Sequence, residues 1–173
     1  IVSQQAATAG QHQSLDYIPG SAILGMVASQ LYAQLTPEEA LQVFHSGAVR
    51  FSDALPVHQG QTAYPVPLCW HHSKGTDYHR KDCLDPKEIY DVSRKDRAQL
   101  AGKQPVQLRQ FYVSEQGRRW QPNKVQTLKT AIDADKNSAA DGQLFGYDAL
   151  AEGQEYTFYV QTQAEVPAAL VDK

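Results

Sequence analysis

The stretch Ser14-Leu15-Asp16-Tyr17-Ile18-Pro19-Gly20-Ser21-Ala22-Ile23-Leu24-Gly25-Met26-Val27-Ala28 decides how the chain is organised. Proline favours an extended residue before it and glycine accepts unusual backbone angles, so Pro19-Gly20 separates an extended segment from a helix. Ser21 is a good N-cap residue, and apolar residues recur at helical spacing as far as Leu35. We therefore expect a helix over about residues 21–34. The free amides at its start suit an anion, and the alternative is an ordinary loop-to-helix entry packed on a sheet.

Composition and charge favour a globular chain. The 173 residues are 42% apolar and 20% charged, with a net charge of −3, which predicts one domain over residues 1–173. No apolar run is long enough to span a bilayer, so we expect no membrane partner. Two cysteines make no disulfide framework, which favours a reducing, cytoplasmic setting. The chain begins at Ile1 rather than Met, and we expect it to be part of a longer protein.

The segment after the first helix carries signals for a second helix. Thr36, Pro37 and Glu39 form a capping-box pattern in which Thr36 is the cap and Glu39 reaches back to it. Gly47 is suited to end that helix. Residues 85–88 predict a further short helix with Asp85 as its cap.

The remaining chain predicts strands. Residues 48–52 alternate, and so do residues 64–70, where Pro65 and Pro67 remove two amide donors and indicate an edge strand or an extended segment. Residues 108–113 and 119–132 predict strands around a turn at 114–117, and residues 154–161 predict the last strand, with Tyr156, Phe158 and Val160 on one face. Residues 71–84 predict a surface loop, and residues 133–142 a turn-rich connection. The pattern predicts an α+β fold with a mainly antiparallel sheet, helices on one face, and hairpin and loop insertions, ferredoxin-like in its simplest form.

Charge is segregated along the sequence. Residues 101–130 hold six basic residues against Glu115, a local charge of +5, whereas residues 131–173 carry −6. Aromatic residues interleave with the cations, a pattern suited to a nucleic-acid backbone together with base stacking. The alternative is a solvated hairpin whose cations protect a sheet edge or meet an acidic protein partner. The aromatic residues are Phe111, Tyr112 and Trp120, and the cations are Lys103, Arg109, Arg118, Arg119, Lys124 and Lys129.

Signals for a metal site or a catalytic site are weaker. His79 and Cys83 have zinc-ligand spacing, and Cys69 or His71 completes a candidate site, but there is no Cys-x-x-Cys pair and a polar loop is the alternative. We therefore expect no metal and no cofactor. No nucleophile elbow, zinc-protease helix or phosphate-binding glycine loop is present. Asp16 is a candidate for general-base or metal-assisted RNA cleavage, or an ordinary loop residue, and we assign no catalytic residue.

Several segments, taken in order, resemble the RAMP superfamily, the RNA-binding subunits of CRISPR effectors. The resemblance covers nearly all of residues 14–162 and is greatest to the subunits of type III effectors, subtype III-D in particular. The matching segments are Asp16-Tyr17-Ile18-Pro19-Gly20-Ser21 with the slim helix after it, Val49-Arg50-Phe51-Ser52-Asp53-Ala54, Pro65-Val66-Pro67-Leu68, Lys129-Thr130-Ala131-Ile132-Asp133 and Ala139-Ala140-Asp141-Gly142-Gln143-Leu144-Phe145.

This resemblance implies a modified ferredoxin-like (RRM-like) domain that holds CRISPR RNA, with a hairpin that wedges into the guide–target duplex. The implied partners are CRISPR RNA, target RNA and other effector subunits, in a ribonucleoprotein that serves antiviral defence. Together with the basic segment, the resemblance yields the expected RNA-binding residues: Tyr17, Gly20, Ser21, Arg109, Arg118, Arg119, Lys124, Lys129, Gly142, Gln143 and Phe145.

The same resemblance bears on catalysis. Cleaving backbone subunits of type III carry an aspartate in a longer loop upstream of the Pro-Gly-Ser break, whereas this chain has a short loop there and offers only Asp16. We therefore expect a non-cleaving structural subunit. The alternatives are a metal-dependent endoribonuclease that uses Asp16, and a protein interaction module without direct RNA contact.

Overall fold

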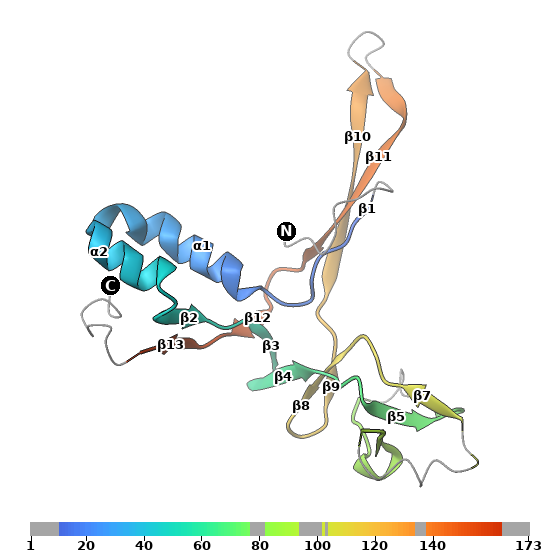
Figure 1. Cartoon of the computed structure of the whole chain (residues 1–173). Coiled ribbons are helices and arrows are strands. Elements are labelled where there is room, and N and C mark those ends of the chain that lie inside the picture. The colour runs from blue at the N-terminus through green and yellow to red at the C-terminus, as the bar shows by residue number, and fades with distance from the viewer. Residues whose placement is uncertain (1–10, 77–81, 94–101, 103, 134–137, 164–173) are drawn as a thin grey trace. The chain divides into compact units, whose positions relative to one another are not determined.

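The chain is an α+β protein with mostly antiparallel strand pairs, as the sequence predicts (Figure 1). The computed structural model describes residues 11–76, 82–93, 102, 104–133 and 138–163. The chain divides into two compact units. Unit 1 comprises Ile1–Leu55 and Asn123–Lys173, and unit 2 comprises Pro56–Pro122.

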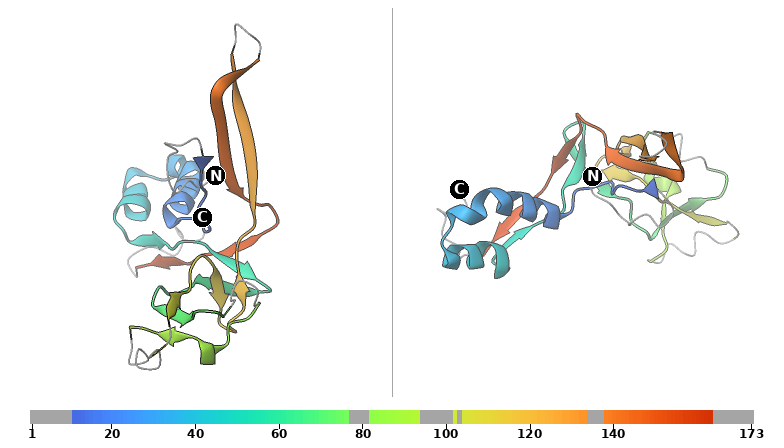
Figure 2. Two further views of the ribbon diagram at one scale, coloured as in Figure 1. Left: turned by 90° about the vertical axis from the view of Figure 1, so that its right-hand side faces the viewer. Right: turned by 90° about the horizontal axis from the view of Figure 1, so that it is seen from above.

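The helices of unit 1 form a hairpin. Helix α1 (Gly20–Leu31) ends in a 3-10 turn (Tyr32–Gln34), and α2 (Pro37–Ala40) continues as a wider turn (Leu41–His45) that runs back beside α1 (Figures 1 and 2). The Tyr32 ring lies 5.6 Å from the Phe44 ring between centroids, and the Tyr32 hydroxyl lies 3.2 Å from His45 Nε2.

The predicted signals of the second helix are confirmed. Thr36 Oγ1 accepts a hydrogen bond from Glu39 N–H at 3.3 Å, and Glu39 Oε2 accepts one from Thr36 N–H at 2.8 Å, which completes the capping box. Gly47 follows the helical segment with φ of +77°, a left-handed angle that favours glycine.

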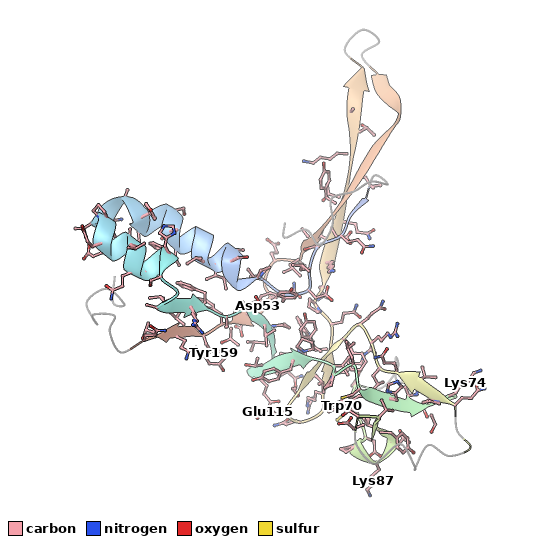
Figure 3. The ribbon with its side chains drawn as sticks, in the orientation of Figure 1. Asp53, Trp70, Lys74, Lys87, Glu115 and Tyr159 are labelled. Carbon is pink, nitrogen blue, oxygen red and sulfur yellow. The ribbon has the colours of Figure 1, made fainter. Side chains whose placement is uncertain are left out.

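The start of α1 is fixed by a strand end distant in sequence and not by Ser21. Pro19 occupies the N-cap position without a side-chain hydrogen bond, and Ser21 is already an exposed helical residue. The carboxylate of Asp53, labelled in Figure 3, accepts the hydrogen bond from Gly20 N–H at 2.8 Å. The backbones of Ile18 and Ala54 pair in both directions. The N-cap prediction for Ser21 is therefore wrong, because the helix begins one residue earlier and its cap comes from the tertiary fold.

The strands of unit 1 form a short ribbon and a long hairpin. The helices lie on one side of the β2–β13 ribbon, in which Val160 pairs with Phe51 (Figures 1 and 2). In the hairpin β10 pairs with β11 from Lys124–Leu150 to Asp133–Ser138, with an irregularity between Thr130 and Ile132, and β1 runs parallel to β11. The strands are β1 (Gln11–His12), β2 (Val49–Phe51), β10 (Lys124–Asp133), β11 (Ser138–Leu150), β12 (Glu155–Thr157) and β13 (Val160–Thr162).

Two predictions in this unit are wrong. The turn-rich connection predicted over residues 133–142 contains the beginning of β11 from Ser138 onward, while residues 134–137 lie outside the described part. The single strand predicted over residues 154–161 is divided into β12 and β13, and Phe158, predicted to share a face with Tyr156, is exposed between them. In both places the partner strand, rather than the local residue preference, determines where pairing occurs.

Unit 2 consists of strands packed around a small apolar core. Strands β3, β4, β8 and β9 are neighbours in one sheet, and β6, β5 and β7 in another. Val66, Leu84, Leu108, Phe111 and Val113 form the core, and Trp70 and Ile89 pack against it. The elements are β3 (Leu55–His58), β4 (Gln61–Pro65), β5 (Trp70–Ser73), a 3-10 helix (Pro86–Glu88), β6 (Tyr90–Asp91), β7 (Pro105–Gln107), β8 (Tyr112–Ser114) and β9 (Arg119–Trp120).

One prediction in unit 2 is corrected and another is confirmed. The segment predicted as an edge strand or an extended segment, residues 64–70, begins with the last two residues of β4. This strand lies between β3 and β8, but Tyr64 and Pro65 pair with β8 alone, so Pro65 is tolerated there. The loop predicted from residue 71 begins as β5, paired with β6 and β7. The Asp85 side chain caps the short helix at Lys87 N–H, 2.9 Å away, as predicted.

Among the residues the structure describes, no helix combines the length and the apolar character that crossing a membrane requires.

The close approach at the start of α1 predicts opposite effects of alanine at two glycines of the same helix. A Cβ at Gly20 would lie 2.2 Å from the Phe51 carbonyl oxygen, so we expect Gly20→Ala to lower the free energy of unfolding by about 2–3 kcal/mol or more. A Cβ at Gly25 would meet nothing within 4 Å, and Gly25→Ala should raise that free energy by about 0.5–1 kcal/mol. Urea unfolding followed by circular dichroism measures both, and equal effects would contradict the packing described.

The cap at the same helix start predicts which polar side chain matters there. Asp53→Ala removes the acceptor for Gly20 N–H and a negative charge at a helix N-terminus, and should lower the free energy of unfolding by about 1 kcal/mol. Ser21→Ala, the matched control, should change it by less than about 0.5 kcal/mol. If Ser21→Ala lowered the free energy of unfolding more than Asp53→Ala does, Ser21 rather than Asp53 would be the residue that caps the helix.

Candidate nucleic-acid interface

The residues predicted to bind RNA are divided between the two units. Unit 2 holds the three arginines, and unit 1 holds the remainder. The basic segment 101–130 is therefore not one hairpin: β8 and β9 form a short hairpin in unit 2, and β10 belongs to a second hairpin in unit 1. In unit 2 lie Arg109, Arg118 and Arg119; in unit 1 lie Tyr17, Gly20, Ser21, Lys124, Lys129, Gly142, Gln143 and Phe145.

Hydrogen bonds within the protein already use part of the polar backbone before α1. Gly20 is buried, and its N–H, predicted to suit an anion, donates to the Asp53 carboxylate. A phosphate at this amide would compete with a carboxylate already in place. Of the other two residues predicted to bind RNA here, Tyr17 is half-buried and Ser21, in the first turn of α1, is exposed, so both side chains remain accessible.

Lys124 forms an ion pair that no sequence pattern indicates. Its Nζ lies 2.6 Å from Asp16 Oδ1 and donates to the Ser14 carbonyl oxygen at 2.7 Å. The two side chains are only 27% and 30% exposed, so the pair is partly shielded from solvent. Lys124 thus offers less charge to a phosphate than its place in the basic segment suggests. A metal ion at Asp16 would have to displace the lysine.

Tyr156 lies close to this pair. Its hydroxyl oxygen is buried and finds no hydrogen-bond partner among the residues the structure describes. Burial, and to a smaller degree the negative charge of Asp16, raise the pKa of Tyr156 to about 12. The phenol therefore keeps its proton at neutral pH and does not supply a base.

Lys129 is an exposed cation of the long hairpin. Its Nζ lies 5.8 Å from the centroid of the Tyr147 ring, and its backbone pairs with Phe145 on β11. Val125 and Leu128 on the same strand are 52% and 69% exposed. The strand thus presents a cation among exposed apolar side chains, a combination suited to phosphate and base contacts. Gly142, Gln143 and Phe145 belong to β11 by their backbone.

The three arginines of unit 2 that were predicted to bind RNA differ in accessibility. Arg109 and Arg118 are exposed, and Arg118 follows Gly117 in the turn between β8 and β9. Arg119 is half-buried, with its guanidinium carbon 5.0 Å from the centroid of the Phe111 ring, where it packs by cation–π contact. Arg109 and Arg118 are therefore the arginines best placed to meet a phosphate.

The aromatic residues expected to stack on bases serve the core of unit 2 instead. Phe111 and Tyr112 are only 4% and 5% exposed, so the expectation that they contact bases is wrong. Trp120 is half-buried and stacks on His58, with ring centroids 5.7 Å apart. The sequence could not distinguish these two roles, because an aromatic residue that is buried in the core and one that stacks on a base have the same pattern of neighbouring cations.

The proposed zinc ligands are not gathered in the part of the chain that the structure describes. His71 Nδ1 lies 3.0 Å from the Cys69 carbonyl oxygen, and the Cys83 thiol is directed at the Gln116 carbonyl oxygen at 3.6 Å. Within the described ranges no three His, Cys, Asp or Glu side chains lie close enough to hold a metal ion. His79 lies outside them.

No profile of a known protein family matches the chain, and a search of curated proteins returned no match.

The effect of the Asp16 charge on Tyr156 predicts a measurable titration. Asp16→Asn should lower the pKa of Tyr156 from about 12 while leaving it above the ordinary value near 10, because burial is the larger cause. Carbon-13 NMR of ring-labelled tyrosine measures the pKa, with Tyr156→Phe identifying the resonance. An unchanged pKa in Asp16→Asn would contradict an influence of the Asp16 charge on the phenol.

The same shift has a consequence for stability. The folded protein holds the Tyr156 proton more tightly than the unfolded chain, so the free energy of unfolding is unaffected below about pH 10 and falls between about pH 10 and 12. Tyr156→Phe should show a smaller fall over that range.

Proposed function

We propose that the chain is a CRISPR RNA-binding structural subunit of a type III ribonucleoprotein effector, with a modified ferredoxin-like (RRM-like) fold. In this role it holds guide RNA and helps to form the channel that binds target RNA, in a cytoplasmic antiviral complex with other effector subunits.

The observation that carries the proposal is the contact between two of the segments on which the resemblance rests. They are separated by more than 30 residues in sequence, yet Ile18 pairs with Ala54 and Gly20 N–H donates to Asp53 at 2.8 Å. A third segment, around Lys129, belongs to the same unit. These three of the segments that resemble the RAMP superfamily thus contribute to one structural unit, which gives a physical reason why they would occur together in one sequence.

The electrostatics support an RNA partner without base-specific contacts at these positions. Lys129, Arg109 and Arg118 are exposed cations on a strand, a loop and a turn. Phosphate contacts of this kind position a nucleic acid and carry no sequence information directly.

The ion pair of Asp16 favours a subunit that does not cleave RNA. A carboxylate that serves as a general base or a metal ligand must be able to accept a proton or a cation, and Asp16 Oδ1 is held 2.6 Å from the Lys124 ammonium. Neighbouring Tyr156, with its raised pKa, offers no alternative base at neutral pH.

The test begins with RNA that co-purifies with the protein from its native host. We expect short RNAs that share one constant end sequence and bind the purified protein again after removal. Charge reversal at Arg118 or Lys129 should weaken this binding several-fold, equally for unrelated sequences, and should reduce the slope of log affinity against log salt by about one.

Lys74→Glu is the matched control, because Lys74 is also exposed but lies outside the predicted interface. It should leave the affinity and the salt slope almost unchanged. Protein that is free of RNA in its host, and that crosslinks through Arg118 only to other proteins, would favour an interaction module instead.

A further inference from the structure

We infer that a cavity within unit 2 binds an unpaired guanine base; that the base belongs to a single-stranded RNA rests on the proposed function. The cavity has a volume of about 550 Å³, within the range typical of small-ligand sites. All of its lining residues belong to unit 2, whereas the long hairpin and the start of α1 belong to unit 1. Its walls combine apolar, aromatic and acidic side chains: Trp70, Leu84, Ile89, Val113, Asp91 and Glu115.

The aromatic wall provides a stacking surface held in a defined position. Trp70 is half-buried at the start of β5, and its side chain packs against the apolar core that includes Leu84 and Val113 (Figure 3). Its backbone is fixed as well, since Trp70 N–H donates to the Pro67 carbonyl oxygen at 3.0 Å. An indole face at a cavity wall stacks well on a planar base, a contact typical of single-strand recognition.

The carboxylates determine which base suits the cavity. An ionised carboxylate accepts hydrogen bonds and donates none, so it pairs with a base edge that donates. Asp91 Oδ1 already accepts from Ser93 N–H at 2.9 Å and from the Ser93 hydroxyl at 2.6 Å, whereas Glu115 is exposed at the cavity wall. Guanine presents two adjacent donors, N1–H and the N2 amino group, which match the two oxygens of one carboxylate. Adenine, cytosine and uracil each place an acceptor beside their donor, and a carboxylate repels that acceptor. Glu115, in the turn between β8 and β9, is the residue that we assign to the guanine edge.

Two cations next to lining residues in the sequence favour a nucleotide over a cationic peptide. Lys87 follows the lining residue Pro86, and Arg118 follows the lining residue Gly117; both are exposed. In this proposal one of these two cations meets the phosphate of the bound nucleotide. A lysine or arginine side chain of a partner would suit the acidic interior, but the same two cations would repel it.

The experiment measures ligand binding through the intrinsic fluorescence of Trp70. The chain has two tryptophans, so Trp120→Phe leaves Trp70 as the single tryptophan, whose fluorescence is excited selectively at about 295 nm or above, where tyrosine no longer absorbs. This protein is titrated with single-stranded pentamers in which a central guanine, inosine or adenine is flanked by uridines, with guanosine monophosphate, and with an arginine-rich peptide. Inosine keeps N1–H but lacks the N2 amino group.

We expect saturable quenching of Trp70 with the guanine pentamer, binding of the inosine pentamer about tenfold weaker, and weaker binding still with adenine. Glu115→Gln should abolish the preference for guanine over inosine. Glu38→Gln, an exposed carboxylate of α2 in unit 1, should preserve it.

The outcomes separate the cavity from the proposed function. Equal binding of all pentamers, or an unchanged preference in Glu115→Gln, would overturn the guanine site and leave RNA binding intact. Quenching by guanosine monophosphate without binding of any pentamer would retain the site and count against RNA as its source. Quenching by the peptide alone would overturn both the guanine assignment and its RNA source.

Discussion

The contact between the start of α1 and the end of β2 is the constraint on which unit 1 depends. The backbone of Gly20 approaches the Phe51 carbonyl oxygen so closely that a Cβ would lie 2.2 Å from it. Within the same few residues, Asp53 accepts the hydrogen bond from Gly20 N–H and Ile18 pairs with Ala54. Steric fit, a helix cap and a strand bridge thus act on one junction, so the helix hairpin cannot shift along β2 without losing all three.

A second constraint is electrostatic, and it changes how the basic segment should be understood. Lys124 is paired with Asp16 at 2.6 Å, and Arg119 packs on the Phe111 ring. Two of the cations that give residues 101–130 their local charge of +5 are therefore engaged within their own unit. The surface available to an anion consists of exposed cations such as Arg118 and Lys129, each held on a turn or a strand whose backbone is well paired.

Much of the secondary structure followed from local patterns. The capping box of α2, the Gly47 terminator, the Asp85 cap and the α+β class each depend on residues within a few positions of one another. Predictions were wrong where pairing partners decided the outcome. The β11 strand runs through residues with turn-forming preference because β10 lies beside it, and residues 71–73, predicted as part of a loop, belong to β5 because β6 and β7 pair with it.

For the candidate site, the sequence by itself determined which side chains carry charge and which segments resemble known RNA-binding subunits. It also indicated that the Pro19-Gly20 junction would be central. Only the tertiary structure decided which of these groups remain available to a ligand. Asp53 accepts the hydrogen bond of Gly20 N–H, Asp16 forms an ion pair with Lys124, and Phe111 and Tyr112 are buried in unit 2. The physical reason is that caps, ion pairs and burial join residues tens of positions apart, a separation across which no local sequence pattern reports proximity.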